Sequence, residues 1–342
     1  MSKPAALGTA AAVLVAAVLV AVFVGAADLN PLATAAALLD KIPFVRLPSS
    51  LDQLDRAVLF QIRLPRVVLG ALVGGLLALA GAGYQGVFRN PLVDSGMLGA
   101  SAGAGLGATL AIVYLGGVGP GTVPVAAFAG SLAGVAVAYA TGAAASRHGA
   151  LGDGVATLLL AGIAVGSFLT AVQTFVLQRS ASDIQSVYSW LLGSLSAASW
   201  QQVTTILPYA AVSSAVILLH GRHLDVLAVG DEEARALGLR PGLVRGLVVA
   251  ACALAAASAV AVSGLIGFVG IIVPHIARRL AGPSYTSVLP LSMLTGAAFL
   301  VLADTLARTV LSPAELPIGV VTAFVGAPAF VWVLRSTGHV ST

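Results

Sequence analysis

Long apolar stretches recur along the chain and set its architecture. A helix needs about 20 apolar residues to cross the hydrocarbon of a bilayer. Ten stretches approach this length: 5–27, 64–84, 95–115, 122–145, 154–178, 202–220, 245–263, 266–280, 286–307 and 316–335. The first follows Lys3 and is longer than the apolar core of a signal peptide, so we interpret it as a membrane helix. The pattern predicts an all-α polytopic membrane protein with about ten transmembrane helices in one domain, residues 1–342.

A charged segment interrupts this pattern at residues 221–245, GRHLDVLAVGDEEARALGLRPGLVR, which hold eight of the 30 charged residues. The segment predicts a short helix with Asp231 at its N-cap and with Glu232 and Glu233 at the positive end of the helix dipole. Gly238 and Pro241 would end that helix. One interpretation is a solvated loop between two spans, and the other is a docking helix for a soluble partner.

Two further segments are expected outside the bilayer. Residues 28–62 contain a predicted interfacial helix at 31–40 and the start of an amphipathic stretch at 51–63, and residues 180–200 carry Trp190 and Trp200. Aromatic residues favour the membrane–water interface. An even number of spans places both termini on one side. With the N-terminus inside, basic residues are more frequent in the inner segments, which favours cytoplasmic termini.

Glycines recur at intervals of four residues within several predicted spans. The sets are Gly70/Gly74, Gly99/Gly103/Gly107, Gly130/Gly134 and Gly162/Gly166. Small residues at this spacing allow membrane helices to approach closely. They predict tight packing and indicate no chemistry.

Composition narrows the classes of function. The chain is 58% hydrophobic and 9% charged, far below the charged fraction of about a quarter in soluble domains. The formal net charge is +4 and the basic residues are scattered, which argues against nucleic-acid binding. The single cysteine, Cys252, lies in an apolar span and cannot form an internal disulfide. No cysteine motif for a metal is present, so no metal site is predicted.

Candidates for catalysis are scarce. Ser101 in GASAGAG could suggest an intramembrane protease, but serine is common in small-residue helix interfaces. His275 beside Arg278 and Arg279 is interpreted as an interfacial histidine. Asp304 is the one acid deep in an apolar run, and Arg308 one turn later could pair with it. Because ion-driven carriers generally need intramembrane carboxylates, energy for transport is expected from outside the chain.

Several segments together resemble FecCD-type permeases, the membrane subunits of type II ABC importers for ferric siderophores, haem and vitamin B12. They are RLPRVVLGALVGGLLALAGAGYQGVFRNPLVDSGMLGASAGAGLGA at 63–108, YSWLLGSLSAASW at 188–200, GDEEARALGLRP at 230–241, SGLIGFVGIIVPHIARRLAG at 263–282, LADTLAR at 302–308 and ELPIGVVTAFVGAPAFVWVL at 315–334. Each is weak alone, and their joint order is specific. The first 60 residues match only loosely.

The resemblance implies a type II ABC importer permease fold in the bacterial cytoplasmic (inner) membrane. It also implies partners: an ABC ATP-binding subunit dimer, a second permease copy and an extracytoplasmic substrate-binding protein. No cofactor is expected on this chain, since ATP and Mg belong to the partner subunit. The chain itself is not expected to be an enzyme.

The resemblance also assigns roles to residues. The coupling helix that contacts the ATPase would comprise Asp231, Glu232, Glu233, Ala234, Arg235, Ala236, Leu237 and Gly238. Arg63, Arg66 and Arg308 match outer arginines that receive acidic residues of the binding protein, with contact to lipid headgroups as the alternative. Asn90, Pro91 and Leu92 match an inner gate, where Leu92 can close a narrow passage by excluding water.

The predicted cargo is an iron chelate, a ferric siderophore or haem, with vitamin B12 as the alternative. Two other classes of protein compete with this interpretation. A secondary carrier or channel would transport without ATP and would leave the 221–245 segment unexplained. An intramembrane hydrolase would use Ser101 and His275.

Overall fold

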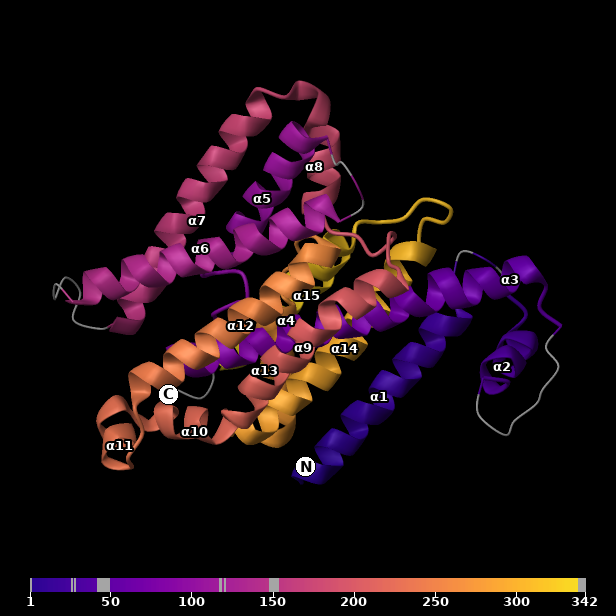
Figure 1. Cartoon of the computed structure of the whole chain (residues 1–342). Coiled ribbons are helices and arrows are strands. Elements are labelled where there is room, and N and C mark those ends of the chain that lie inside the picture. Colours follow the sequence, from indigo (N-terminus) through magenta and orange to yellow (C-terminus); the bar gives the residue numbers. More distant parts are fainter. Residues whose placement is uncertain are drawn as a thin grey trace.

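The structure is a computed structural model that describes residues 2–25, 27, 29–41, 50–116, 119, 121–147 and 154–337. All regular elements in these residues are helices (Figure 1). Their bounds are α1 Lys3–Phe23, α2 Pro31–Leu39, α3 Gln53–Ala57, η1 Val58–Arg63, α4 Leu64–Phe88, α5 Ala100–Leu115, α6 Thr122–Arg147, α7 Gly154–Gln178, η2 Ala181–Asp183, α8 Ile184–Leu191, α9 Trp200–Leu219, α10 Gly221–Val229, α11 Asp231–Ala236, α12 Pro241–Ser263, α13 Val269–Ala281, α14 Tyr285–Thr309 and α15 Ile318–Thr337.

A helix forms within each of the ten predicted stretches, but the count of about ten membrane crossings is not confirmed. Seven helices of the described chain are long and apolar enough to cross a bilayer, whereas the described apolar parts of α5 and α15 are shorter and α13 has 13 residues. The physical reason is clearest for α5. It begins five residues later than predicted because residues 89–99 form a loop, so its 16 residues span only about 24 Å.

Helix α4 lies at the centre of the bundle. It is buried along most of its length and packs against α14, α12, α13 and α9, which surround it in Figure 1. Helices α5, α6, α7 and α8 form a second group on one side, joined to the first chiefly through α12 and α6. Helix α1 packs on α14 at the opposite edge. Much of the surface of α1, α6, α7 and α9 is exposed, as expected for helices that face lipid or another subunit.

Several glycines of the four-residue sets lie at helix contacts, as predicted. A Cβ placed on Gly103 would lie 2.1 Å from the carbonyl oxygen of Gly130, and one on Gly74 would lie 2.3 Å from that of Gly296. Such distances exclude any side chain, so α5 meets α6 and α4 meets α14 backbone to backbone. Gly166 differs, because its nearest neighbours would be 3.9 Å away.

Gly81 provides a test of this packing. A Cβ on Gly81 of α4 would lie 2.1 Å from the Gly270 carbonyl oxygen of α13, whereas one on the helical Gly8 meets nothing within 4 Å. We expect Gly81→Ala to destabilise the protein by about 1–3 kcal/mol through overpacking. Gly8→Ala should be neutral or slightly stabilising, because alanine favours the helix. Thermal unfolding midpoints of the two variants in detergent measure the difference, and equal midpoints would contradict the close α4–α13 contact.

The predicted outer segments are found in part. The interfacial helix expected at 31–40 is α2, and the Asn30 side chain caps it by accepting hydrogen bonds from the backbone N–H groups of Leu32 and Ala33. Residues 28 and 42–49 of the 28–62 segment lie outside the described residues. The stretch at 51–63 forms α3 and η1, which continue directly into α4. In the 180–200 segment, η2 and α8 form, while Trp200 begins α9 and donates its indole N–H to the Phe60 carbonyl at 2.8 Å.

Candidate functional site

Helices α10 and α11 project as a compact unit at one end of the bundle (Figure 1). Of the predicted coupling residues, only Ala234 is fully buried, and Asp231 is half-buried. The others present an acidic, basic and apolar surface to solvent, with Leu237 70% exposed. Val229 at the end of α10 adds a second apolar side chain that is 72% exposed. An exposed apolar spot rimmed by charges is the composition expected of a contact surface for another protein.

Of the two ends of α11, only the N-terminal end differs from the prediction. The N-cap is Gly230, not Asp231, because the Asp231 carboxylate is engaged by Arg245 and is therefore unavailable to the helix N-terminus. At the other end, Gly238 has the left-handed φ of 81° and its N–H donates to the Arg235 carbonyl. This is the predicted glycine stop.

Asp231 connects three parts of the chain. Both of its oxygens accept hydrogen bonds from the Arg245 guanidinium of α12, at 2.7 and 2.5 Å. The Arg89 guanidinium, at the end of α4, lies 3.6 Å from the same carboxylate. The hydrogen bonds from Arg245 lower the pKa of Asp231 below its ordinary value, so the carboxylate is ionised at physiological pH.

Helix α10 is fixed to the start of α14. The Asp225 carboxylate accepts hydrogen bonds from the Tyr285 backbone N–H at 2.6 Å and from the Ser284 hydroxyl at 2.8 Å. The Lys3 ammonium donates to the Thr286 hydroxyl at 3.2 Å in the same region. The N-terminus of α1 therefore lies at the same end of the bundle as α10 and α11.

The predicted gate residues lie in the loop at residues 89–99, at this same end. Arg89 ends α4 with a left-handed φ of 49°. The Asn90 side-chain oxygen then accepts from the Leu92 backbone N–H at 2.9 Å, a local turn in which Pro91 needs no donor. Leu92 is 47% exposed, so it is available to contact a neighbour across a passage.

Sequence analysis missed the residues that hold this loop from within. The buried Gln85 side chain donates to the Val93 carbonyl at 3.2 Å and to the Gly270 carbonyl at 2.9 Å. It also accepts from the Arg278 guanidinium of α13 at 2.5 Å. The only sequence signal was a lone amide in an apolar run, since its partner Arg278 is 193 residues away.

The three predicted docking arginines gather at the opposite end of the bundle, but they are buried. Arg63, Arg66 and Arg308 are 3%, 7% and 5% exposed. The Arg63 guanidinium donates to the carbonyls of Val22 at 2.8 Å and Ala27 at 2.6 Å, and the Arg308 guanidinium donates to the Ala21 carbonyl. These two arginines satisfy carbonyls at and beyond the C-terminal end of α1, where the helix dipole favours positive charge.

Arg66 is the closer partner of Asp304, and the predicted Asp304–Arg308 pair forms beside it as a longer contact. The Arg66 guanidinium contacts Asp304 at 2.8 Å, while Arg308 is 3.9 Å from that carboxylate. Arg66 also donates to Glu315 at 2.8 and 3.0 Å, a partner that sequence analysis missed. The hydrogen bonds from Arg66 lower the pKa of Glu315, which is the more exposed of the two acids. A binding protein that uses Arg66 must therefore compete with this internal carboxylate.

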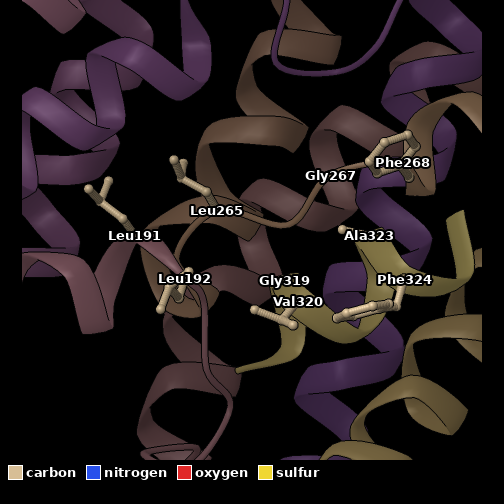
Figure 2. A pocket seen from close by; sticks show the side chains of 9 residues that line it. All are labelled: Leu191, Leu192, Leu265, Gly267, Phe268, Gly319, Val320, Ala323 and Phe324. Atoms are coloured by element: carbon tan, nitrogen blue, oxygen red, sulfur yellow. The ribbon is translucent and has the colours of Figure 1, made fainter. Parts of the chain in front are cut away.

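Two adjoining cavities open along the side of the bundle between these ends. The smaller, of about 490 Å³, lies between the end of α8, the α12–α13 connection and α15 (Figure 2). The larger, of about 860 Å³, lies between α5 and α7 and carries hydroxyl groups of Ser101, Ser167, Thr170 and Thr174. Leu191 and Leu265 line both cavities. None of their described lining residues is charged, so together they offer a neutral surface to a passing solute.

Nothing in the described residues supports catalysis by Ser101 and His275. Ser101 lines the larger cavity, whereas His275 lies on α13 and its Nε2 is buried without a hydrogen-bond partner. Among the described residues, no hydrogen bond joins the Ser101 and His275 side chains. The described residues contain no group of three or more His, Cys, Asp or Glu side chains that could hold a metal ion.

Comparison with known proteins gives consistent matches. The model of the FecCD transport family matches residues 13–336. The cobalamin import system permease protein BtuC of Halobacterium salinarum is 44% identical over 80% of this chain and 72% of its own length. The ferric-citrate import system permease protein YfmD of Bacillus subtilis is 37% identical over 82% of each chain. A solved inward-facing structure of a metal-chelate type ABC transporter has a TM-score of 0.83 at 30% identity, covering 97% of this chain and 99% of that one.

Proposed function

The chain belongs to the FecCD transport family, and we propose that it is the permease subunit of an ATP-driven importer for a metal chelate. The single observation that carries the mechanism is the exposed α10–α11 unit. It presents charged and apolar side chains outward, while Asp225 and Asp231 fix it to α14, α12 and α4. A unit held in this way suits the transfer of motion from a soluble ATPase to the helices. A secondary carrier needs no such unit.

The proposed assembly contains two permeases, two ATP-binding subunits and a substrate-binding protein. ATP and Mg bind to the ATP-binding subunits. The permease spans the cytoplasmic membrane with α10, α11 and the N-terminus of α1 inside, and with the cluster around Arg66 outside. The second permease is a copy of this chain that covers the cavities beside α7 and α15. Support comes from the exposed surface of α7 and from the two open, neutral cavities.

In the proposed cycle, ATP binding moves α11, and the cavities open alternately to the two sides. Asn90, Pro91 and Leu92 form the inner gate, with Leu92 excluding water from the closed passage. Support comes from the exposure of Leu92 and from the loop's position at the same end as α11. The permease makes and breaks no covalent bond in this cycle.

The proposed cargo is an iron chelate, as expected from the sequence, and a specific observation favours cobalamin as a second candidate. Relatives named for cobalamin and vitamin B12 are 44% and 40% identical, compared with 37% for the ferric-citrate permease. The uncharged cavities offer no group that would select one of these bulky cargoes over the other. Discrimination between them is expected to lie in the binding protein.

A pull-down tests the assembly and the cargo together. The tagged chain is extracted from its native membrane in mild detergent, and its partners are identified by mass spectrometry. We expect an ABC-type ATPase and a substrate-binding protein, and the visible spectrum of the latter separates haem, ferric chelate and corrinoid. Recovery of the chain alone, in a preparation that still transports, would contradict the proposal.

Arg63, Arg66 and Arg308 are retained as the proposed docking group, with Arg66 as the testable member. Glu315→Gln removes the carboxylate that occupies Arg66 and leaves the pair with Asp304 in place. Because an external acid then meets no internal competitor, the dissociation constant of the binding protein should fall severalfold at low salt. Surface plasmon resonance with the purified complex measures it, with Asp183→Asn as the matched control. An unchanged dissociation constant would remove Arg66 from the docking surface.

A further inference from the structure

The contacts of Asp231 tie the coupling helix to the loop that carries the proposed gate. Asp231 is the first residue of α11, and Arg89 is the residue that directly precedes Asn90, Pro91 and Leu92. The 3.6 Å approach of the Arg89 guanidinium to the Asp231 carboxylate is therefore a direct connection between these two parts. The two residues are 142 positions apart in sequence, and no local pattern predicts their contact.

The geometry of Arg89 makes it suited to pass on a displacement. Its φ of 49° is a left-handed conformation, which non-glycine residues rarely adopt and which the surroundings must hold in place. It lies at the point where α4 ends and the 89–99 loop begins. A change of backbone conformation at this residue would redirect the loop without disturbing the buried part of α4.

The opposite side of the loop is fixed to other helices. Gln85 holds the Val93 and Gly270 carbonyls and is itself held by Arg278 of α13. The loop is thus attached at Val93 to the α4–α13 contact and at Arg89 to α11. A movement of α11 relative to α4 and α13 must pull on, or break, the Arg89–Asp231 contact.

Arg245 has a different part in the same cluster. It forms the two shortest contacts of Asp231, from the first turns of α12. This pairing orients the carboxylate toward the bundle and leaves it half-buried, so Asp231 is poorly placed to contact a partner. Glu232 and Glu233, the next residues along α11, are exposed.

We propose that Asp231 is a positioning residue that transmits movement of α11 to the 89–99 loop through Arg89, while Arg245 holds its carboxylate in place. This inference rests on the proposed permease function and identifies one contact by which the coupling helix would act on the gate. It separates Asp231 from Glu232 and Glu233, which contact the ATPase. Loss of the Arg89–Asp231 contact should therefore disconnect α11 from the gate.

The test measures the solvent accessibility of the proposed gate at position 92. Leu92→Cys places a thiol on an exposed position, while the native Cys252 is fully buried. The complex of this variant with its ATPase is reconstituted in liposomes, and the rate of thiol labelling by a maleimide is measured with and without ATP. We expect ATP to change that rate at least about fivefold, the lower range of allosteric coupling. In Leu92→Cys with Asp231→Asn the ratio should fall to about one.

Two further variants distinguish transmission from a general structural effect. Arg89→Gln should reproduce the loss while ATP hydrolysis and co-purification of the ATPase persist, because Arg89 lies outside the coupling helix. Asp183→Asn, a carboxylate removed from η2, should keep the full response. A retained ATP response in Asp231→Asn or in Arg89→Gln would overturn the proposal. If the parent neither responds to ATP nor transports, the permease function itself fails.

Discussion

Replacing Glu232 and Glu233 together by lysine is expected to reduce ATP-driven uptake by about tenfold or more. Both acids lie in the first turn of α11, where the helix dipole favours negative charge, and both are exposed. A surface of the ATPase that receives two carboxylates would instead meet two ammonium groups. Like charges brought together in an interface cost several kcal/mol, enough to detach or uncouple the partner.

The measurement is uptake by proteoliposomes that contain the permease, its ATPase and its binding protein. The neutral pair Glu232→Gln and Glu233→Gln is the graded control, since it removes attraction without introducing repulsion and should lose less uptake. Both acids are exposed, so neither change should alter the unfolding midpoint of the isolated permease appreciably. Unchanged uptake in the lysine variant would exclude α11 as the docking helix.

Asp304→Ala is expected to destabilise the protein by about 3–5 kcal/mol, the usual consequence of removing one partner from a buried ion pair. Asp304 is 3% exposed and accepts three hydrogen bonds from Arg66. Without Asp304, the buried guanidinium of Arg66 keeps Glu315 as its carboxylate partner. The nearby charge of Arg308 is left without its carboxylate.

Thermal or denaturant unfolding in detergent measures this loss. Asp183→Ala is the matched control, because that acid is less buried and its carboxylate accepts a hydrogen bond from the adjacent Ser182 hydroxyl. We expect it to change the free energy of unfolding by no more than about 0.5 kcal/mol. Equal stability of Asp304→Ala and Asp183→Ala would show that the Arg66–Asp304 pair does not hold this end of the bundle together.

Local patterns in the sequence predicted much of the fold. Apolar length located a helix in every predicted stretch, and the spacing of Gly74, Gly103 and Gly130 identified backbone contacts. Gly238 marked the end of α11 because a left-handed residue there favours glycine. The count of crossings was less predictable. Apolar residues before Ala100 belong to the 89–99 loop and shorten α5, and composition does not distinguish such a loop from the start of a helix.

The site was predicted less completely because its contacts join distant residues. The i, i+4 spacing suggested Arg308 as the partner of Asp304, but the closer partner is Arg66, 238 residues away. Asp231 had the sequence features of an N-cap, and Arg245 redirected it. At Asp304 a long-range ion pair is added to the one that local spacing favours, and at Asp231 a long-range ion pair takes the place of the expected N-cap. The burial of Arg63 and Arg308 likewise depends on α1, whose own residues give no sign that these two arginines cap its C-terminal end.

The most direct test of the permease function is uptake into proteoliposomes that contain this chain, its ATPase and its binding protein loaded with the cargo. Accumulation that requires both ATP hydrolysis and the binding protein is the predicted result. Accumulation by the chain alone, without ATP, would contradict it. The chain would then be a secondary carrier, and the exposed α10–α11 unit would be a connecting segment only.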